Sequence, residues 1–152
     1  MIITILDTLI SGMTSGNYSF ELKVGAAEWQ NLLSDEYAFS DNNALVFLDM
    51  PIENDFQAAQ SGYIGEVYDV NLFFMFKSNF DWTPLQHDSN CINQARLAIR
   101  QFISVLQDSD LIDSIEDIGT ATSFINLLDV NVSGMILPIS IKPNINASVC
   151  IQ

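Results

Sequence analysis

The stretch Tyr63–Lys77, YIGEVYDVNLFFMFK, decides the fold of this chain. Side chains alternate between the two faces of a strand, so every second residue shares a face. One face is wholly apolar and is expected to form the core: Tyr68, Val70, Leu72, Phe74 and Phe76. The other face is polar over its first half and apolar over its second half, where Phe73 and Met75 lie. The stretch therefore predicts a long strand with one buried face and an apolar patch on its back.

Alternation, or a compact apolar run, predicts shorter strands on both sides of this stretch. Tyr18–Val24 alternates, Ala44–Asp49 is a compact apolar run, and two more strands are expected at Thr122–Leu128 and Met135–Lys142. Pro138 has no N–H to donate to a neighbouring strand. We therefore expect the last strand to lie at a sheet edge or to contain a bulge.

Two helices are predicted. The apolar residues between positions 2 and 9 recur with helical spacing and indicate a short helix. A longer helix begins after Thr83, a good N-cap, with Pro84 at the first helical position and Gln86 completing a capping box. It is expected to run to about Gln107, which makes it roughly 35 Å long.

The remaining segments are predicted as connections. Residues 26–33 are expected to form a short helix or turn, and residues 34–43 and 51–62 to form loops. Residues 108–117 are expected to form an acidic connection with one helical turn near Leu111–Ile115, and residues 131–134 a turn.

The strands occur in neighbouring runs and do not alternate with helices. This order predicts one α+β domain over residues 1–152, with a mainly antiparallel sheet of four to five strands and helices packed on one face. Residues 143–152 are expected to form a C-terminal arm. A chain of this size can bury roughly 70% of its unfolded surface and needs no disulfide or metal to fold.

The charge balance is strongly acidic. Five Lys and Arg residues oppose nineteen Asp and Glu residues, for a formal charge of −14. Specific nucleic-acid binding through phosphate contacts and binding to an anionic membrane are therefore not expected. The acidic residues either line a surface along which a polyanion slides or balance the apolar character of the rest of the surface. Five acids, expected to face a channel or solvent, gather after the long helix: Asp108, Asp110, Asp113, Glu116 and Asp117.

No export signal and no membrane-spanning segment are expected from the sequence. Residues 1–10 are apolar but have no basic flank, and no apolar run reaches the roughly 20 residues that span a bilayer. We expect synthesis in the cytoplasm. Cys91 and Cys150 form no zinc or C-x-x-C pattern and are expected to be buried or idle thiols in a reducing cytoplasm.

No residue pattern indicates catalysis, a cofactor or a metal. His87, in the first turn of the long helix, is expected to be solvated, and a dyad with Cys91 is disfavoured because helix interiors rarely present a nucleophile in a cleft. Asp108, Asp110 and Asp113 resemble the start of a calcium loop but lack its central glycine and its twelfth-position Glu. We expect a protein that binds other subunits and is not an enzyme.

The apolar back of the long strand needs a cover. The cover is either intramolecular, from the N-terminal helix or from residues 26–33, or it is a neighbouring subunit. Ile136 of the last strand has the same outward parity as the back face and is expected to share its cover.

The order of these elements over residues 44–142, about two-thirds of the chain, resembles the neck and tail-completion (tail terminator) proteins of tailed bacteriophages. The matching features are the strand ending in Phe47–Pro51, the long strand Tyr68–Lys77, the Thr83-Pro84 helix start and the segment Leu127–Gly134 before the closing strand. Each motif is ordinary turn or cap chemistry, and the order and spacing carry the likeness.

The resemblance implies a non-enzymatic virion protein, made in the bacterial host cytoplasm, that forms a homo-oligomeric ring at the neck or tail end. Such a ring joins portal or connector to tail around the DNA channel, and an acidic lumen would repel the passing DNA. The residues then expected at subunit interfaces are Phe73, Met75, Ile136, Val149 and Ile151. The alternative is an acidic secretion-chaperone-like or inhibitor protein that binds a basic or amphipathic client as a homodimer.

Overall fold

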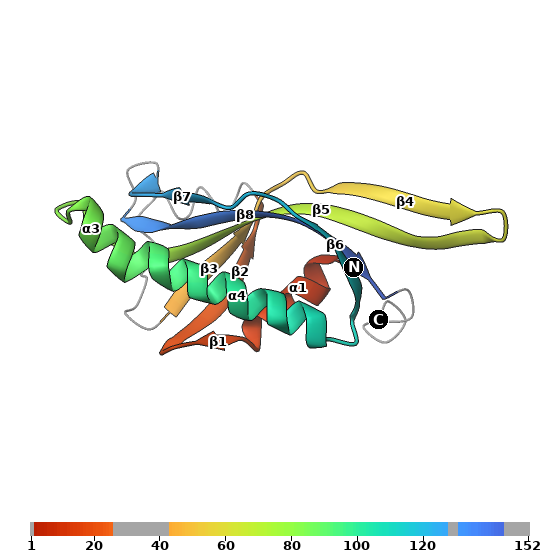
Figure 1. Cartoon of the computed structure of the whole chain (residues 1–152), viewed down its shortest axis with the longest axis horizontal. Coiled ribbons are helices and arrows are strands. Elements are labelled where there is room, and N and C mark those ends of the chain that lie inside the picture. Colours follow the sequence, from red (N-terminus) through yellow and green to blue (C-terminus); the bar gives the residue numbers. More distant parts are fainter. Residues whose placement is uncertain (1, 26–42, 128–130, 145–152) are drawn as a thin grey trace.

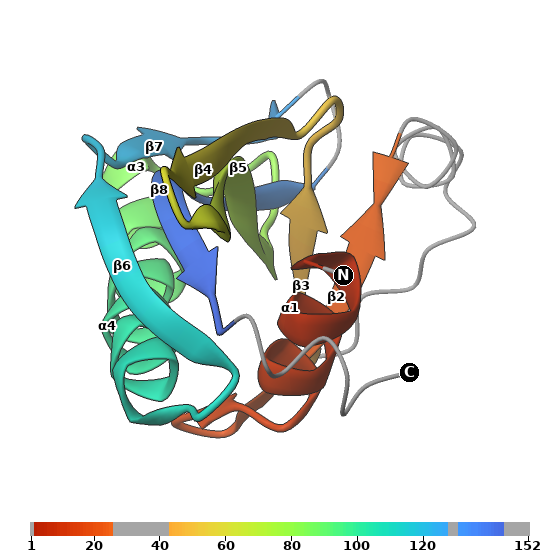
Figure 2. The ribbon, with the colours of Figure 1, turned by 90° about the vertical axis from the view of Figure 1, so that its right-hand side faces the viewer.

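The computed structural model describes residues 2–25, 43–127 and 131–144. Within these residues, two helices pack against the concave side of an eight-stranded mixed sheet that curls into a half-barrel (Figures 1 and 2). The α+β class is as expected. The expected number of strands, four to five, is wrong.

The elements follow the chain in a simple order. The first helix is α1 (Ile2–Ser11), and the second is a continuous helix made of α3 (Pro84–His87), a π-helical turn η1 (Asp88–Ile92) and α4 (Asn93–Asp108). The strands are β1 (Thr14–Ser15), β2 (Tyr18–Val24), β3 (Asn43–Leu48), β4 (Glu53–Ala59), β5 (Gly62–Lys77), β6 (Ile112–Ile118), β7 (Thr122–Phe124) and β8 (Val132–Pro143).

The long strand β5 organises the sheet. The main order is β1-β2-β3-β5-β8-β6, while β4 pairs with the first half of β5 and β7 with the first residues of β8. Only the β2–β3 pair is parallel; the other strand pairs of the described chain are antiparallel. The expectation of a mainly antiparallel sheet is therefore confirmed.

The main core lies between the inner face of the sheet and the two helices. Val70, Leu72, Phe74 and Phe76 of β5 are buried there, as their alternation predicts. The ring of Phe74 meets that of Phe102 from α4 with centroids 5.7 Å apart. Burying a large apolar side chain stabilises the fold by about 1.5–3 kcal/mol. This face of β5 therefore holds the second helix against the sheet.

The long helix begins as its sequence indicates. The amide of Gln86 donates to Thr83 Oγ1 at 3.3 Å, and the amide of Thr83 donates to Gln86 Oε1 at 2.8 Å. The capping box is thus complete, with Pro84 at the start of the helix. The apolar pattern did not predict the π-helical turn η1, which leaves the adjacent residues Cys91 and Ile92 both buried.

Two segments expected as connections are strands. Residues 53–59 form β4, and residues 112–118 form β6 where a helical turn was expected. β4 is exposed on nearly every residue, so it lacks the alternation that marks a half-buried strand. Two register shifts break the alternation of β6 against β8.

The closing strand begins earlier than expected. Residues 131–134 were expected to form a turn, but β8 starts at Val132. Gly134 pairs with both Met75 and Phe124, and a Cβ atom at this position would lie 1.8 Å from the carbonyl oxygen of Phe74. Glycine here allows β8 to approach the backbone of β5 closely, which is a packing role and not a turn role.

Pro138 lies in an interior strand and not at the sheet edge. β8 is flanked by β5 on one side and by β6 and β7 on the other. The amide of Gly119 donates to the Pro138 carbonyl at 2.9 Å, so the missing N–H of Pro138 faces the break between β6 and β7. The proline is tolerated because no strand is paired at that point.

Three expectations fall on residues outside the described ranges. They are the short helix or turn at 26–33, most of the loop at 34–43 and most of the C-terminal arm at 143–152. At the start of that arm, the Asn144 amide donates to the Leu111 carbonyl at 2.9 Å.

Candidate functional site

A buried polar network joins the start of the long helix to the sheet. His87 Nδ1 lies 3.0 Å from Ser133 Oγ, which also accepts from the amide of Asn126 at 3.1 Å. Ser78 Oγ donates to Asn126 Oδ1 at 2.8 Å. The expectation that His87 is solvated is wrong, because only 2% of this residue is exposed. The helix starts directly over β8, a tertiary contact that helical periodicity does not reveal.

The Ser133–His87 pair has the atoms of a nucleophile and a base but not their setting. Ser133 has no exposed surface, so no substrate can reach its hydroxyl. The His87 ring packs edge-on to Trp82 with centroids 5.5 Å apart, and no carboxylate hydrogen-bonds to it among the described residues. Nucleophilic catalysis requires access and an oriented base. The network therefore has a structural role, which is to connect the start of the long helix to β8.

Cys91 is a buried thiol. It has no exposed surface, and its Sγ donates to the Lys77 carbonyl at 3.2 Å. Burial raises the pKa of this thiol to about 12, so it stays protonated at neutral pH. Cys91 and His87 face different partners and form no dyad, and the expectation of a buried thiol is confirmed for Cys91. Cys150 lies outside the described residues.

The five acids expected in one group are spread along an edge of the sheet. Each is exposed, from the end of α4 through β6: Asp108, Asp110, Asp113, Glu116 and Asp117. Asp113 lies 3.9 Å from the ammonium of Lys142. Charges and bulges on an edge strand discourage pairing with another chain. No group of three or more potential metal-ligating side chains occurs in the part of the chain that the structure describes.

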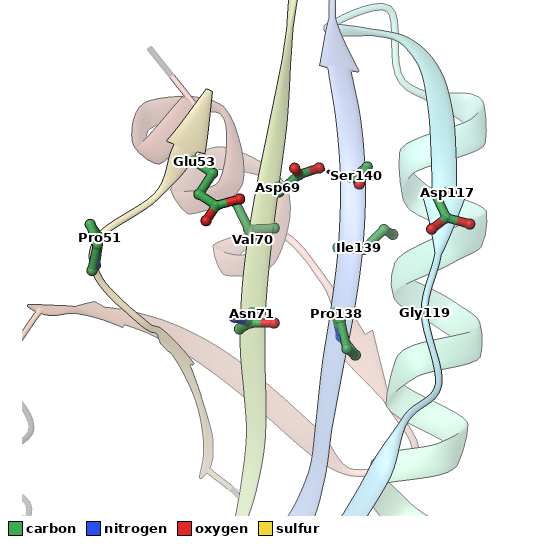
Figure 3. Close-up of a pocket in the computed structure, with 10 residues that line it drawn as sticks. All are labelled: Pro51, Glu53, Asp69, Val70, Asn71, Asp117, Gly119, Pro138, Ile139 and Ser140. Atoms are coloured by element: carbon green, nitrogen blue, oxygen red, sulfur yellow. Dashed lines mark hydrogen bonds between the residues drawn. The ribbon is translucent and has the colours of Figure 1, made fainter. Parts of the chain in front are cut away.

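One of these acids lines a shallow hollow on the back of the sheet (Figure 3). The hollow has a volume of about 400 Å³, and Asp117, Asp69 and Glu53 contribute carboxylates to its walls. The Ser140 hydroxyl donates to Asp69. None of the described residues that line it is basic. Such a surface disfavours phosphate groups.

The apolar back of β5 is covered by its own chain. Leu45, Phe47, Met75 and Val132 form a second small core, against which Phe73, Phe124 and Leu127 pack. The cover thus includes residues of β7 and just after it. The N-terminal helix, one of the expected covers, packs on the opposite face of the sheet.

The residues expected at subunit interfaces therefore differ in how exposed they are. Met75 has no exposed surface, so the expectation that it meets a neighbour directly is wrong for this structure. Phe73 and Ile136 are half-buried. Val149 and Ile151 lie outside the described residues.

Three exposed large apolar side chains lie on a feature that the sequence pattern did not predict. β4 and the first half of β5 form a hairpin, hereafter the arm (residues 53–69), that extends well beyond the rest of the fold (Figure 1). Phe56 is 67% exposed, Tyr63 52% and Ile64 46%. A usable signal was the polar pair before Gly62, which has a φ of 118° and closes the hairpin.

The two aromatic residues share one face of the arm. Phe56 is paired with Glu66, and Ala58, two residues further along β4, is paired with Tyr63. A register shift between Gln57 and Ala58 leaves Ile64 as an extra residue on β5, so Tyr63 and Glu66 stay on the same face. Paired residues of antiparallel strands project to the same face. The Tyr68 hydroxyl donates to Glu66 Oε2 at 2.6 Å, which fixes this carboxylate beside the aromatic pair. The arm therefore presents apolar rings next to a negative charge.

The backbone of the arm is also open. β8 pairs with β5 only from Tyr68 onward, so the other edge of residues 62–67 has no partner strand among the described residues. The outer edge of β4 is likewise unpaired in the described chain. A two-stranded hairpin is marginally stable in water, and open strand edges readily accept another chain. The arm has the features of a docking element.

Comparison with known proteins adds no family. No protein-family model matches the chain, and no curated protein matches it. Among the described residues, none of the helices has both the length and the apolar character needed to cross a bilayer.

Proposed function

We propose that this protein is a non-enzymatic structural subunit of a tailed-bacteriophage virion. In this proposal it forms a homo-oligomeric ring at the neck or tail end and joins portal or connector to tail around the DNA channel. The order of the sequence elements, which resembles tail-completion proteins, supports the family. The exposed arm is the single observation that carries the assembly role.

The arm supports assembly because it continues a core strand and carries exposed apolar side chains near its tip. β5 runs without interruption from the core into the arm over 16 residues. The direction of the arm is therefore set by the core. Burying Phe56 or Tyr63 against a partner would each contribute up to about 1.5–3 kcal/mol. Such exposure on a projecting element is typical of an interface.

The distribution of charge and of reactive groups supports the same role. The acids along β6 and in the hollow are exposed, so they can face a channel through which DNA passes. His87 and Cys91 are buried and hydrogen-bonded, so neither offers an accessible nucleophile or base.

The experiment compares an arm variant with a matched control. We expect Phe56→Ser/Tyr63→Ser to fold but to lose self-association in sedimentation and native mass spectrometry. Leu85→Ser removes a residue that is 73% exposed on the long helix and should assemble normally. Both variants are also introduced into the native genome, and purified particles are examined by immunoelectron microscopy. The protein should localise to the neck or tail end, and the arm variant should be missing from particles.

The opposite result is equally clear. A wild-type chain that is monomeric at all concentrations and absent from particles contradicts the proposal. A discrete homodimer that captures a basic client would support the chaperone or inhibitor alternative.

A further inference from the structure

One face of the long helix differs from the rest of this acidic surface. Nineteen of 152 residues are acidic, yet residues 89–107 contain no acid and include both Arg96 and Arg100. Neither arginine has a carboxylate within ion-pair distance among the described residues, and the Arg96 guanidinium donates only to Asn93 Oδ1, at 3.5 Å. Leu97, beside them, is 40% exposed. We call Arg96, Leu97 and Arg100 the helix patch.

The helix patch faces outward as a unit. Residues three and four apart on a helix are neighbours on one face. The buried side of α4 is formed by Ala95, Ala98, Ile99, Phe102 and Leu106. The patch therefore presents one apolar side chain beside two positive charges.

The arm presents the complementary chemistry. Residues 53–69 contain four acids and no basic residue. Glu66 lies on the same face as Phe56 and Tyr63. The arm thus offers aromatic rings beside a negative charge, where the helix patch offers an aliphatic side chain beside positive charges. Matching of this kind orients partners and selects between them.

The contact has to be made between two copies. The arm projects past both helices in Figure 1, and it continues β5, so it cannot fold back onto its own α4. We infer that the arm of one copy docks on the helix patch of a second copy, with Phe56 and Tyr63 against Leu97 and with Glu66 facing Arg96 and Arg100. This inference rests on the proposed function. A contact between two different patches repeats from copy to copy and closes as a ring if the rotation allows.

Site-directed disulfides test the contact directly. Phe56→Cys and Leu97→Cys are made as separate proteins in a Cys150→Ser background, in which the other cysteine, Cys91, is fully buried. The two proteins are mixed under mild oxidation. Leu85→Cys, on the same helix and also exposed, replaces Leu97→Cys in the control mixture.

We expect about tenfold more mixed disulfide with Leu97→Cys than with Leu85→Cys, the ratio produced by about 1.4 kcal/mol of preference. Equal yields, no mixed disulfide, or dominant pairing of Phe56→Cys with itself would each overturn the contact. If the last pattern occurs in protein that still assembles into particles, the proposed function stands and only this contact is wrong.

A charge exchange tests the same contact without cysteines. Glu66→Lys alone, or Arg96→Glu/Arg100→Glu alone, should weaken self-association about tenfold or more. Mixing the two variants should restore association between them, because the charges are then complementary again. Failure of the mixture to associate, with both variants folded by circular dichroism, counts against the inference.

Discussion

His87 Nδ1 lies 3.0 Å from Ser133 Oγ, and both residues are buried. The bond connects the first turn of the long helix to the start of β8, 46 residues later in the chain. It fixes the helix over the end of the sheet where β5 ends and β8 begins, away from the arm. The pair has the residue types of a catalytic dyad, but its role is to hold the long helix against the sheet.

Ser133→Ala should lower the free energy of unfolding by about 1–3 kcal/mol, because it leaves His87 Nδ1 and the Asn126 amide without a partner in the interior. Urea denaturation measures the change. Ser104→Ala, at an exposed position on α4, is the control and should stay within about 0.5 kcal/mol of the wild type. An unchanged midpoint for Ser133→Ala would contradict the structural role of the network.

Gly134→Ala should destabilise the protein by about 3 kcal/mol or more, because the new methyl group would lie 1.8 Å from the Phe74 carbonyl oxygen and force two central strands apart. Thermal unfolding followed by circular dichroism measures the loss. Gly12→Ala is the matched control, since its Cβ would meet atoms only at 3.5 Å and beyond. Similar melting temperatures for both variants would show that β5 and β8 are not so closely packed.

Cys91 should resist alkylation in the native state. Because burial raises the pKa of its thiol to about 12, almost no thiolate exists at pH 8. Peptide mass spectrometry after iodoacetamide treatment should find Cys91 modified in urea and unmodified without it. Rapid modification of the native protein would refute the burial.

The same raised pKa makes the contribution of Cys91 to stability depend on pH. The folded state holds the thiol proton more tightly than the unfolded state, whose pKa is near 9.0. The stabilisation is therefore complete below pH 9 and lost as pH rises toward 12. The difference in unfolding free energy between wild type and Cys91→Ala should shrink over this interval, as measured by denaturation at successive pH values.

Thr83→Ala should cost about 1 kcal/mol of stability, because it removes the side-chain oxygen that accepts the Gln86 amide at the start of the long helix. Thr83→Ser retains that oxygen and should be close to the wild type. The two variants are compared by denaturant titration. Equal losses for both would indicate that the methyl group of Thr83, and not its hydroxyl, supports the helix.

The sequence predicts those elements that bury one face and leave the other face exposed. β2, β3, β5 and the two helices each have a regular apolar face against the core, and their positions agree with the expectations within a few residues. The local chemistry of Thr83 also identified the helix start. β4 and β6 were missed because one is exposed on nearly all sides and the other contains bulges. The period of apolar residues reports which side chains are buried. It therefore does not detect an exposed strand that is held in place only by backbone pairing with the neighbouring strand.

By itself, the sequence determined the α+β class, the long strand at Tyr63–Lys77 with its core face, the capped helix after Thr83 and the acidic character of the surface. Only the tertiary structure decided that Met75 is covered by its own chain, that His87 is tied to Ser133, and that residues 53–69 project as an arm. The physical reason is the range of the interactions. Alternation along a strand and capping of a helix depend on residues that are close in the chain. Whether a side chain is covered, which strand pairs with which and which segment stays exposed depend on segments that are distant in the chain.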